Sequence, residues 1–293
     1  MTASASPVAD RAPGRAIVLV LLATLAFATV EATAKTLTES LPVPQVVWGR
    51  YAFTMLVFVP WLLRGRWREV VATRRPRAQL VRSLLLLSGT ITGFAGLSLM
   101  PLATVTVLFF ATPLFVTAFA APMLGERIGP RRWLGVLVGF AGVVIVVRPG
   151  GDGLGWPALL PVATAMAYAL YQIVTRRVSS EPPLVSLFYA ALIGALVMCA
   201  AVPFFWQAPD AQSWALMALT GLVGGLGHFL LIKAFEAASP ATTAPFLYSH
   251  LIWAVVYGAL LFGDLPDGWT VAGAAVIVAS GIYVWHRERG AAR

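Results

Sequence analysis

The chain has 293 residues, of which 59% are hydrophobic and only 11% carry a charge, and its mean hydropathy is +0.82. This composition excludes an ordinary water-soluble domain, in which about a quarter of the residues are charged. The net charge of +9 is compatible with a nucleic-acid partner. The placement of the cations, described below, instead indicates a membrane protein, and we expect no binding of nucleic acid.

Ten apolar stretches are long enough to cross a bilayer as helices. About 20 residues are needed, because a helix rises about 1.5 Å per residue through an apolar layer about 30 Å thick. The stretches do not alternate apolar with polar residues, as the strands of an outer-membrane barrel do. The predicted spans are residues 15–38, 44–63, 80–99, 101–123, 131–148, 156–176, 184–206, 213–235, 240–262 and 268–286.

Short polar segments precede and follow these spans. Residues 1–14 are rich in Ala, Ser and Pro and are predicted to form a disordered tail, and residues 287–293 form a second, basic tail. The stretch 15–38 is too long, and too polar at its end, for a cleaved signal peptide, so we expect it to remain as the first span. The single cysteine, Cys199, excludes an intramolecular disulfide.

Basic residues gather at alternate ends of the predicted spans. If both termini are cytoplasmic, every one of the 21 Lys and Arg residues except Lys35, Arg50 and Arg148 falls on the cytoplasmic side. The densest cluster lies in the loop between the second and third spans, at 64–82. This bias follows the positive-inside rule and predicts a multi-pass protein of a bacterial inner membrane with both termini in the cytoplasm.

A short motif at the end of the fourth span recurs at the end of the ninth. At an offset of 138 residues, Gly125 and Glu126 match Gly263 and Asp264. Both acidic residues lie beside predicted helix ends, so we interpret them as structural corners of the fold and not as catalytic groups.

The repeated motif divides the chain into two halves of five spans, residues 15–148 and 156–286. Because five is an odd number, the second half enters the membrane from the opposite side. The charge bias agrees, since the first corner is rich in arginine and the second contains none. The sequence therefore predicts an all-α integral membrane protein with ten transmembrane helices, arranged as two inverted five-helix repeats around a central cavity.

Three ionisable residues lie inside the first two spans. An ionisable group at this depth costs at least about 2–3 kcal/mol, so it implies a partner or a function. Glu31 and Arg50 lie at similar depth, and Lys35 is one helical turn beyond Glu31. Two interpretations stay open at this point: a structural ion pair or gate, or direct contact with a charged substrate.

The second half carries polar and aromatic residues at the corresponding depths. His228 and His250 lie nearer the midplane, where a histidine can relay a proton or form a hydrogen bond with a substrate. No third ligand accompanies them, so we predict no metal site, and no cofactor is expected. The further cavity candidates of this half are Tyr168, Gln172, Tyr189, Tyr248 and Trp253.

Enzyme motifs are missing from the sequence. It contains no G-x-x-x-x-G-K-[ST] phosphate loop, which excludes ATP as the energy source, and neither H-E-x-x-H nor G-x-S-x-G. The ionisable groups within the spans are scattered over different depths and do not converge at one interface. We therefore expect no enzyme, and the alternative from another class is a membrane enzyme acting on lipid-linked substrates.

The layout and motifs resemble the drug/metabolite transporter superfamily, in its ten-helix EamA-type branch. The resemblance covers about residues 15–286, and Asp264 stands where the family commonly has glutamate. It rests on the five-plus-five layout, on Arg50 in the second span, on Leu124-Gly125-Glu126-Arg127 followed by Gly135, Gly139 and Gly142, and on Phe262-Gly263-Asp264 followed by Gly273 and Gly281.

The resemblance implies a carrier or exchanger driven by a proton or by another gradient. We expect a secondary active transporter that moves small amphipathic metabolites across the inner membrane by alternating access. Amino acids are the favoured substrates, and a riboflavin-like or adenosyl-compound permease is the main alternative. The expected partners are the small-molecule substrate, a coupled proton or counter-substrate, and the lipid bilayer.

Overall fold

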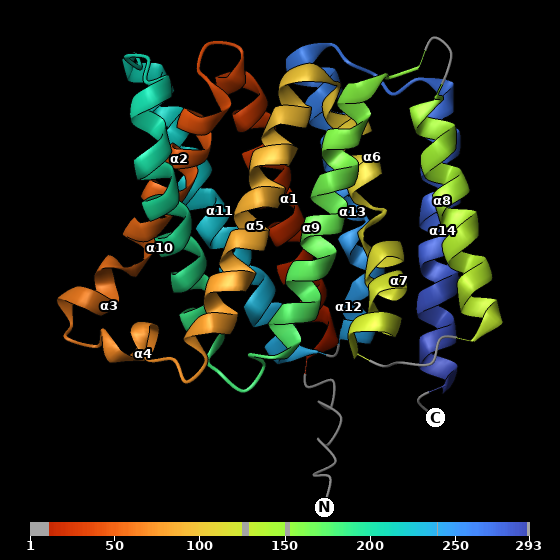
Figure 1. The fold of residues 1–293 in the computed structure, drawn as a ribbon, viewed down its shortest axis with the longest axis horizontal. Coiled ribbons are helices and arrows are strands. Elements are labelled where there is room, and N and C mark those ends of the chain that lie inside the picture. The colour runs from red at the N-terminus through yellow and green to blue at the C-terminus, as the bar shows by residue number, and fades with distance from the viewer. Residues whose placement is uncertain (1–11, 125–128, 150–152, 239, 292–293) are drawn as a thin grey trace, which may run out of the picture.

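The computed structural model describes residues 12–124, 129–149, 153–238 and 240–291. This part of the chain is helical and contains no strand (Figure 1). The predicted disordered tail lies almost wholly outside the described residues, and so do Gly125 and Glu126 of the first predicted corner.

The ten predicted spans each fall on one helix or on a run of consecutive helices. The first five are α1 (Pro13–Thr38), α2 (Val43–Met55) with η1 (Leu56–Phe58) and α3 (Val59–Leu63), α5 (Pro76–Leu99), α6 (Leu102–Phe109) with α7 (Thr112–Leu124), and α8 (Pro130–Val147). The basic loop before α5 contains a short helix that we did not expect, α4 (Arg68–Val71).

The second five follow the same scheme. They are η2 (Trp156–Ala158) with α9 (Leu159–Arg176), α10 (Pro183–Ala201) with η3 (Val202–Phe205), α11 (Ala211–Ala237), α12 (Pro240–Leu247) with α13 (Ser249–Tyr257) and the π-helix η4 (Gly258–Phe262), and α14 (Gly268–Ala291). By length and hydropathy, seven helical stretches of the described chain are candidate membrane spans, and 133–147 and 268–284 are shorter apolar helices. Large apolar side chains such as Phe204 and Leu260 are exposed, as contact with lipid requires.

Proline sets the start of several helices and the break within one. Pro13, Pro76 and Pro183 stand in the first turn of their helices, where a missing N–H costs no hydrogen bond. Pro113 lies inside the fourth predicted span, and its missing N–H leaves the carbonyl of Phe109 without its helical donor. The Thr112 hydroxyl donates to that carbonyl at 2.6 Å, so the carbonyl keeps a partner at the break between α6 and α7.

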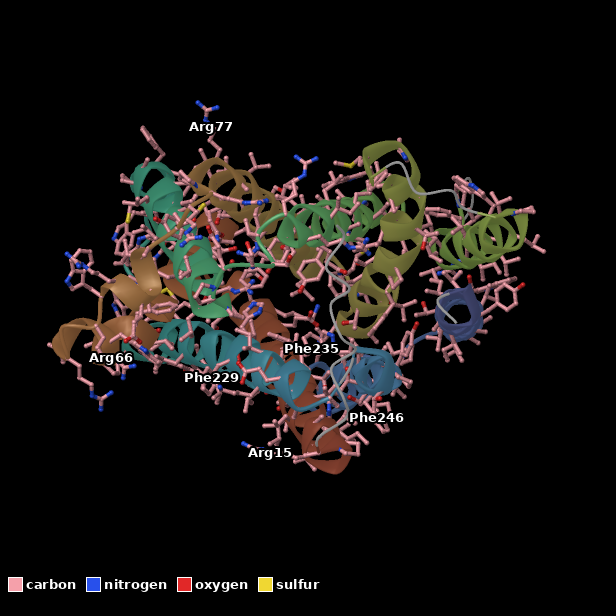
Figure 2. The ribbon with its side chains drawn as sticks, turned by 90° about the horizontal axis from the view of Figure 1, so that it is seen from below. Arg15, Arg66, Arg77, Phe229, Phe235 and Phe246 are labelled. Atoms are coloured by element: carbon pink, nitrogen blue, oxygen red, sulfur yellow. The ribbon has the colours of Figure 1, made fainter. Side chains whose placement is uncertain are left out.

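Helices from the two halves pack against each other in pairs. α1 packs most extensively on α11, α5 on α9, and α8 on α14, while α2 packs on both α11 and α10. Figure 1 shows that α1 and α9, the first long helices of the two halves, run in opposite directions. It also shows that the start of α1 and the end of α14 lie at the same end of the molecule as α3 and α4. We call this the basic end, and Arg66 and Arg77 point outward there (Figure 2).

Candidate functional site

A small hollow of about 20 Å³, room for about one water molecule, lies between helices of the two halves. Four helices contribute to it, α2 and α5 from the first half and α10 and α11 from the second. Its lining includes Arg50 and Tyr51 of α2, Leu86 of α5, Ala190 of α10, and Gly224 and His228 of α11. The hollow therefore brings two of the predicted site residues, Arg50 and His228, to one place.

The guanidinium of Arg50 is held by contacts that are neutral. Its Nη1 donates to Thr90 Oγ1 at 3.1 Å, and the same hydroxyl is 2.9 Å from the Tyr51 hydroxyl. The charge also lies 5.6 Å from the ring centre of Tyr51 and 5.5 Å from that of Phe94, within the range of cation–π attraction. Among the described residues, no carboxylate forms an ion pair with Arg50.

Glycines of neighbouring helices hold α2 rigidly in this position. A Cβ added at Gly221 of α11 would lie 2.7 Å from the Arg50 carbonyl oxygen and 2.8 Å from the Thr54 nitrogen. One added at Gly194 of α10 would overlap the Tyr51 ring. Small residues thus allow the backbones to approach, and the approach fixes where the Arg50 side chain emerges.

Gly221 and Gly224, two glycines of α11, give a matched pair of substitutions. Gly221→Ala forces α2 and α11 apart, and overpacking of this kind costs about 1–3 kcal/mol of stability. Gly224→Ala places its methyl 3.6 Å from Val30 and 3.9 Å from Arg50 Nε, which are ordinary contacts. Thermal unfolding of the purified variants should show a lower midpoint for Gly221→Ala only. Equal midpoints would contradict the tight approach.

Arg82 is a buried cation that sequence reasoning assigned to the basic loop. It lies in α5, is only 5% exposed, and makes contacts to α9 and α10. Its Nε donates to Thr175 Oγ1 at 2.8 Å, its Nη1 to the Ser186 carbonyl at 2.8 Å, and its Nη2 to the Tyr171 hydroxyl at 2.6 Å. Its position inside the predicted span 80–99 could have indicated this role, because an arginine within a span needs partners.

Glu31 of α1 lies next to the two broken spans, which contain α6 and α13. Its Oε2 accepts from the Thr106 hydroxyl of α6 at 3.1 Å and lies 3.2 Å from Nε2 of His250 in α13. The His250 ring is buried, and its Nε2 is close to the carboxylate without hydrogen-bonding geometry. The structure therefore gives Glu31 a partner from each half, but not Arg50, which the sequence had suggested.

Two aromatic residues meet where the fourth and ninth predicted spans are broken. Phe110 follows α6 and Tyr248 precedes α13, and their rings stack with centres 5.1 Å apart. The two positions are 138 residues apart, which is the offset of the repeated corner motif. His250 is packed edge-on to Phe110 at 6.2 Å. These breaks therefore lie beside the carboxylate of Glu31.

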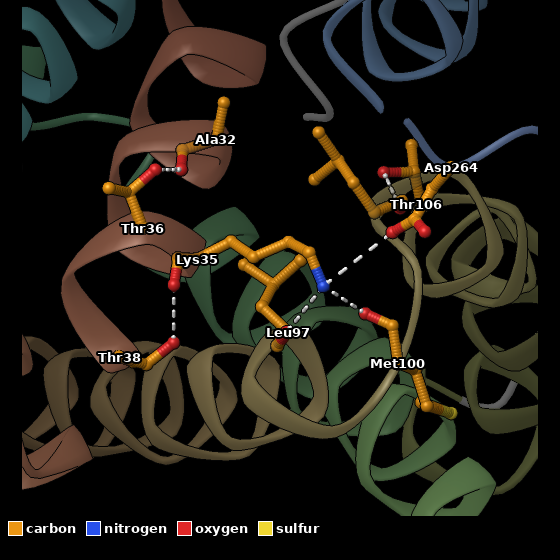
Figure 3. A network of polar contacts seen from close by, with 9 residues as sticks. Ala32, Lys35, Thr36, Thr38, Leu97, Met100, Thr106 and Asp264 are labelled. Carbon is orange, nitrogen blue, oxygen red and sulfur yellow. Dashed lines mark hydrogen bonds and ion pairs between the residues drawn. The ribbon is translucent and has the colours of Figure 1, made fainter. Parts of the chain in front are cut away.

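Lys35 lies one turn beyond Glu31 and binds carbonyl groups at the end of α5 (Figure 3). Its Nζ donates to the carbonyl oxygens of Leu97 at 3.3 Å and Met100 at 2.9 Å, which the end of the helix leaves without helical donors. It also lies 3.9 Å from Oδ2 of Asp264. These contacts give Lys35 a structural role at the end of the molecule opposite the basic end.

The second predicted corner has the expected form of a turn. Gly263 adopts a left-handed conformation with φ of 67°, which favours glycine, and the Asp264 N–H donates to the Gly258 carbonyl at 2.9 Å. Gly125 and Glu126 of the first corner lie outside the described residues. Among the described residues, no group of His, Cys, Asp and Glu side chains has a metal-binding arrangement.

The remaining predicted site residues are dispersed. Tyr168 packs between Phe109 and Tyr171, and Trp253 has a buried indole N–H without a described partner. Gln172 is exposed on α9, which argues against its expected contact with the cavity. The Tyr189 hydroxyl donates to the carbonyl of Val71 at 3.0 Å, so it binds the basic loop and does not point into the hollow.

A carboxylate at the basic end joins the loop after α9 to the start of α5. Glu181 accepts hydrogen bonds from the Thr73 hydroxyl at 2.7 Å, from the Arg74 N–H at 2.7 Å and from Gln79 Nε2 at 2.7 Å. Burial raises the pKa of Glu181, but these hydrogen bonds and one from the Arg75 N–H lower it further than burial raises it. We call this contact the Glu181 latch.

An amide takes the corresponding place at the other end. Gln45, in the first turn of α2, is fully buried and donates from Nε2 to the Gln207 carbonyl at 2.7 Å. Its Oε1 accepts from the Gln207 N–H at 2.9 Å. We call this the Gln45 latch. Each latch joins the start of a helix in the first half to a loop of the second half.

Glu181→Gln is expected to loosen the basic end, because a neutral amide oxygen accepts hydrogen bonds more weakly than a carboxylate. Trypsin should then cleave the arginine-rich loop around Arg74 faster than in the unchanged protein. Since the pKa of Glu181 is lowered, the latch is present at neutral pH and is lost only as the pH falls through that lowered value. Glu69→Gln in the same loop is the control, and equal cleavage of both variants would contradict the latch.

The two halves also match one family model. The model of the EamA-like transporter family matches residues 14–148 and again residues 155–285. The chain belongs to this family. It is a multi-pass membrane transporter of the drug/metabolite transporter superfamily and not an enzyme.

Its curated relatives carry different substrates. An S-adenosylmethionine uptake transporter of Rickettsia bellii is 31% identical over 248 residues, covering 84% of this chain and 85% of the relative. A riboflavin transporter of Rhizobium johnstonii is 30% identical and covers 94% and 93%. The pseudopaline exporter CntI of Pseudomonas aeruginosa is 27% identical and covers 94% and 97%.

A solved crystal structure shares the fold. It aligns with a TM-score of 0.64 at 21% identity, over 92% of this chain and 95% of the other. The match of the family model to both halves confirms the family expected from the sequence.

Proposed function

We propose that this EamA-like protein is a secondary active transporter that carries a small amphipathic metabolite by alternating access. The observation that supports it best is the hollow at Arg50, because helices of both halves line it inside the apolar part of the molecule. A site at the interface of two halves is the place where rocking of one half against the other exposes a substrate first to one side and then to the other.

The proposed architecture is ten transmembrane helices in two inverted halves, residues 15–148 and 156–286. Exchange of the halves converts the α1–α11 contact into the α9–α5 contact, and both are among the most extensive in the molecule. The same exchange places the helix break at Phe110 on the break at Tyr248. Both correspondences support an inverted repeat.

We propose a bacterial inner membrane as the location, with both termini in the cytoplasm. The support is the charge bias, since the exposed arginines of the loop before α5 lie at the same end as the start of α1. In this orientation the Glu181 latch closes the cytoplasmic side and the Gln45 latch closes the outer side. Alternating access would break them in turn.

The substrate class that we propose combines an amino-acid group with an apolar part. The sequence favoured free amino acids as substrates. The relatives named for S-adenosylmethionine add adenosyl amino acids as candidates. S-adenosylmethionine itself carries an amino-acid head group, so the two expectations share one chemistry. Riboflavin is the second candidate, because a relative of similar identity is named for it.

The pair of Glu31 and His250 is the proposed coupling site. It holds the one carboxylate located within the apolar spans, and it touches α1, α6 and α13 beside the broken helices. A carboxylate beside an imidazole can hold and release a proton as the helices move, so either a proton or a counter-substrate can exchange with the cargo here.

Uptake into liposomes tests the proposal. Purified protein is reconstituted and offered labelled S-adenosylmethionine, methionine and riboflavin, with empty liposomes as the control. We expect saturable uptake of at least one amino-acid probe, faster when the same unlabelled compound is present inside. Uptake of riboflavin alone would select the second candidate, and no uptake of any probe would contradict the proposed function.

A further inference from the structure

Arg50 and Arg82 are two cations within the apolar helices, and their hydrogen bonding differs. A guanidinium has five N–H donors. Arg82 donates from all three of its nitrogens, to Thr175, Ser186 and Tyr171. Arg50 makes one described side-chain hydrogen bond, from Nη1 to Thr90. Its Nε and Nη2 therefore have donors left for a ligand.

The groups around Arg50 fix the orientation of its guanidinium at the edge of the hollow. Thr90 holds Nη1, and the rings of Tyr51 and Phe94 flank the planar group. The Nε lies near Gly224, where an added Cβ would be 3.9 Å from it. The guanidinium is thus oriented in advance, which lowers the entropy that binding would cost.

The positive charge of Arg50 is also not balanced within the hollow. No described carboxylate pairs with Arg50, and the other described lining residues are apolar apart from Tyr51, Thr54 and His228. A charged group at this depth without a partner is unfavourable unless a ligand compensates it. One permanent positive charge matches one negative charge, and the planar fork of a guanidinium matches the two oxygens of a carboxylate.

We propose that Arg50 binds the carboxylate of the transported molecule, with His228 lining the same site. This inference rests on the proposed transport function and narrows its substrate class to carboxylate-bearing metabolites. Glu31, which contacts Thr106 and His250 and does not line the hollow, is then left for the coupled proton. Arg82 is a positioning residue for α5 and does not contact the cargo.

A pair of probes that differ in the carboxylate alone tests the assignment. S-adenosylmethionine and its decarboxylated form keep the same sulfonium, amine and adenosyl groups. The unchanged protein should take up S-adenosylmethionine at least about 10-fold more efficiently, as expected for one charge-assisted pair. Arg50→Gln should abolish this preference by slowing only the carboxylate probe. Arg50→Lys should keep part of the preference, and Arg77→Gln, at the exposed start of α5, should keep all of it.

The outcomes separate this inference from the transport function. If the two probes enter equally, or if the preference survives in Arg50→Gln, the carboxylate assignment fails while the transport function stands. If riboflavin enters and neither member of the pair does, the assignment also fails alone. If the unchanged protein takes up no probe, the proposed function fails and the inference fails with it. Should Arg50→Gln not elute as a folded protein in size-exclusion chromatography, the partial loss in Arg50→Lys decides.

Discussion

Replacing Glu31 by Gln is expected to reduce uptake by about 10- to 100-fold, the equivalent of losing one interaction with a charged group. The amide has the shape of the carboxylate and can still accept from Thr106, so the protein should remain folded. What it lacks is the charge beside His250 and the ability to take up a proton. Initial rates in proteoliposomes, at equal amounts of reconstituted protein, measure the effect.

Glu39 supplies the control for this substitution. It lies at the exposed end of the same helix, so Glu39→Gln removes the same charge outside the apolar region. Its uptake should stay close to that of the unchanged protein. If Glu31→Gln also transports at the unchanged rate, the pair of Glu31 and His250 has no part in coupling and serves only to hold α1 against α13.

Arg82→Leu is expected to cause the largest loss of stability. It removes the N–H groups that donate to the Tyr171 hydroxyl and to the Ser186 carbonyl, both of which lie inside the helical bundle. Each polar group left unpaired costs about 1–3 kcal/mol, so we expect a total loss of about 2 kcal/mol or more. Thermal unfolding in detergent, followed by tryptophan fluorescence, should show a clearly lower midpoint.

The matched control is Arg77→Leu, five residues earlier on α5 and exposed. It removes the same charge and side-chain length without leaving buried groups unpaired, so its midpoint should change little. A midpoint for Arg82→Leu equal to that of Arg77→Leu would show that the three hydrogen bonds of Arg82 do not stabilise the contact of α5 with α9 and α10.

Much of the fold follows from the sequence, because hydrophobic length determines which segments form helices in a membrane protein. All ten predicted ranges are helical in the structure. The subdivisions were harder to predict. Pro113 lies at the break between α6 and α7, and the Thr112 hydroxyl replaces the donor that the proline lacks. The helix α4 was missed because its segment is polar and basic.

The candidate site was less predictable, because it depends on how helices rotate about their axes. Glu31 and Arg50 were placed at similar depth, but α1 turns Glu31 toward His250 while Arg50 of α2 faces the hollow. Gln172 illustrates the same limit, since it is adjacent to the buried Tyr171 and is itself exposed. Apolar spans carry little periodic signal from which such rotations can be inferred.

Thiol accessibility at the hollow tests the central claim most directly. Cys199 is the only cysteine, so a Cys199→Ala protein gives a clean background for Gly224→Cys, whose Cβ fits without overlap. We predict that a membrane-impermeant maleimide labels this position from either side of the membrane, and that a transported substrate slows both reactions. Labelling from one side only, under all conditions, would contradict alternating access at this site.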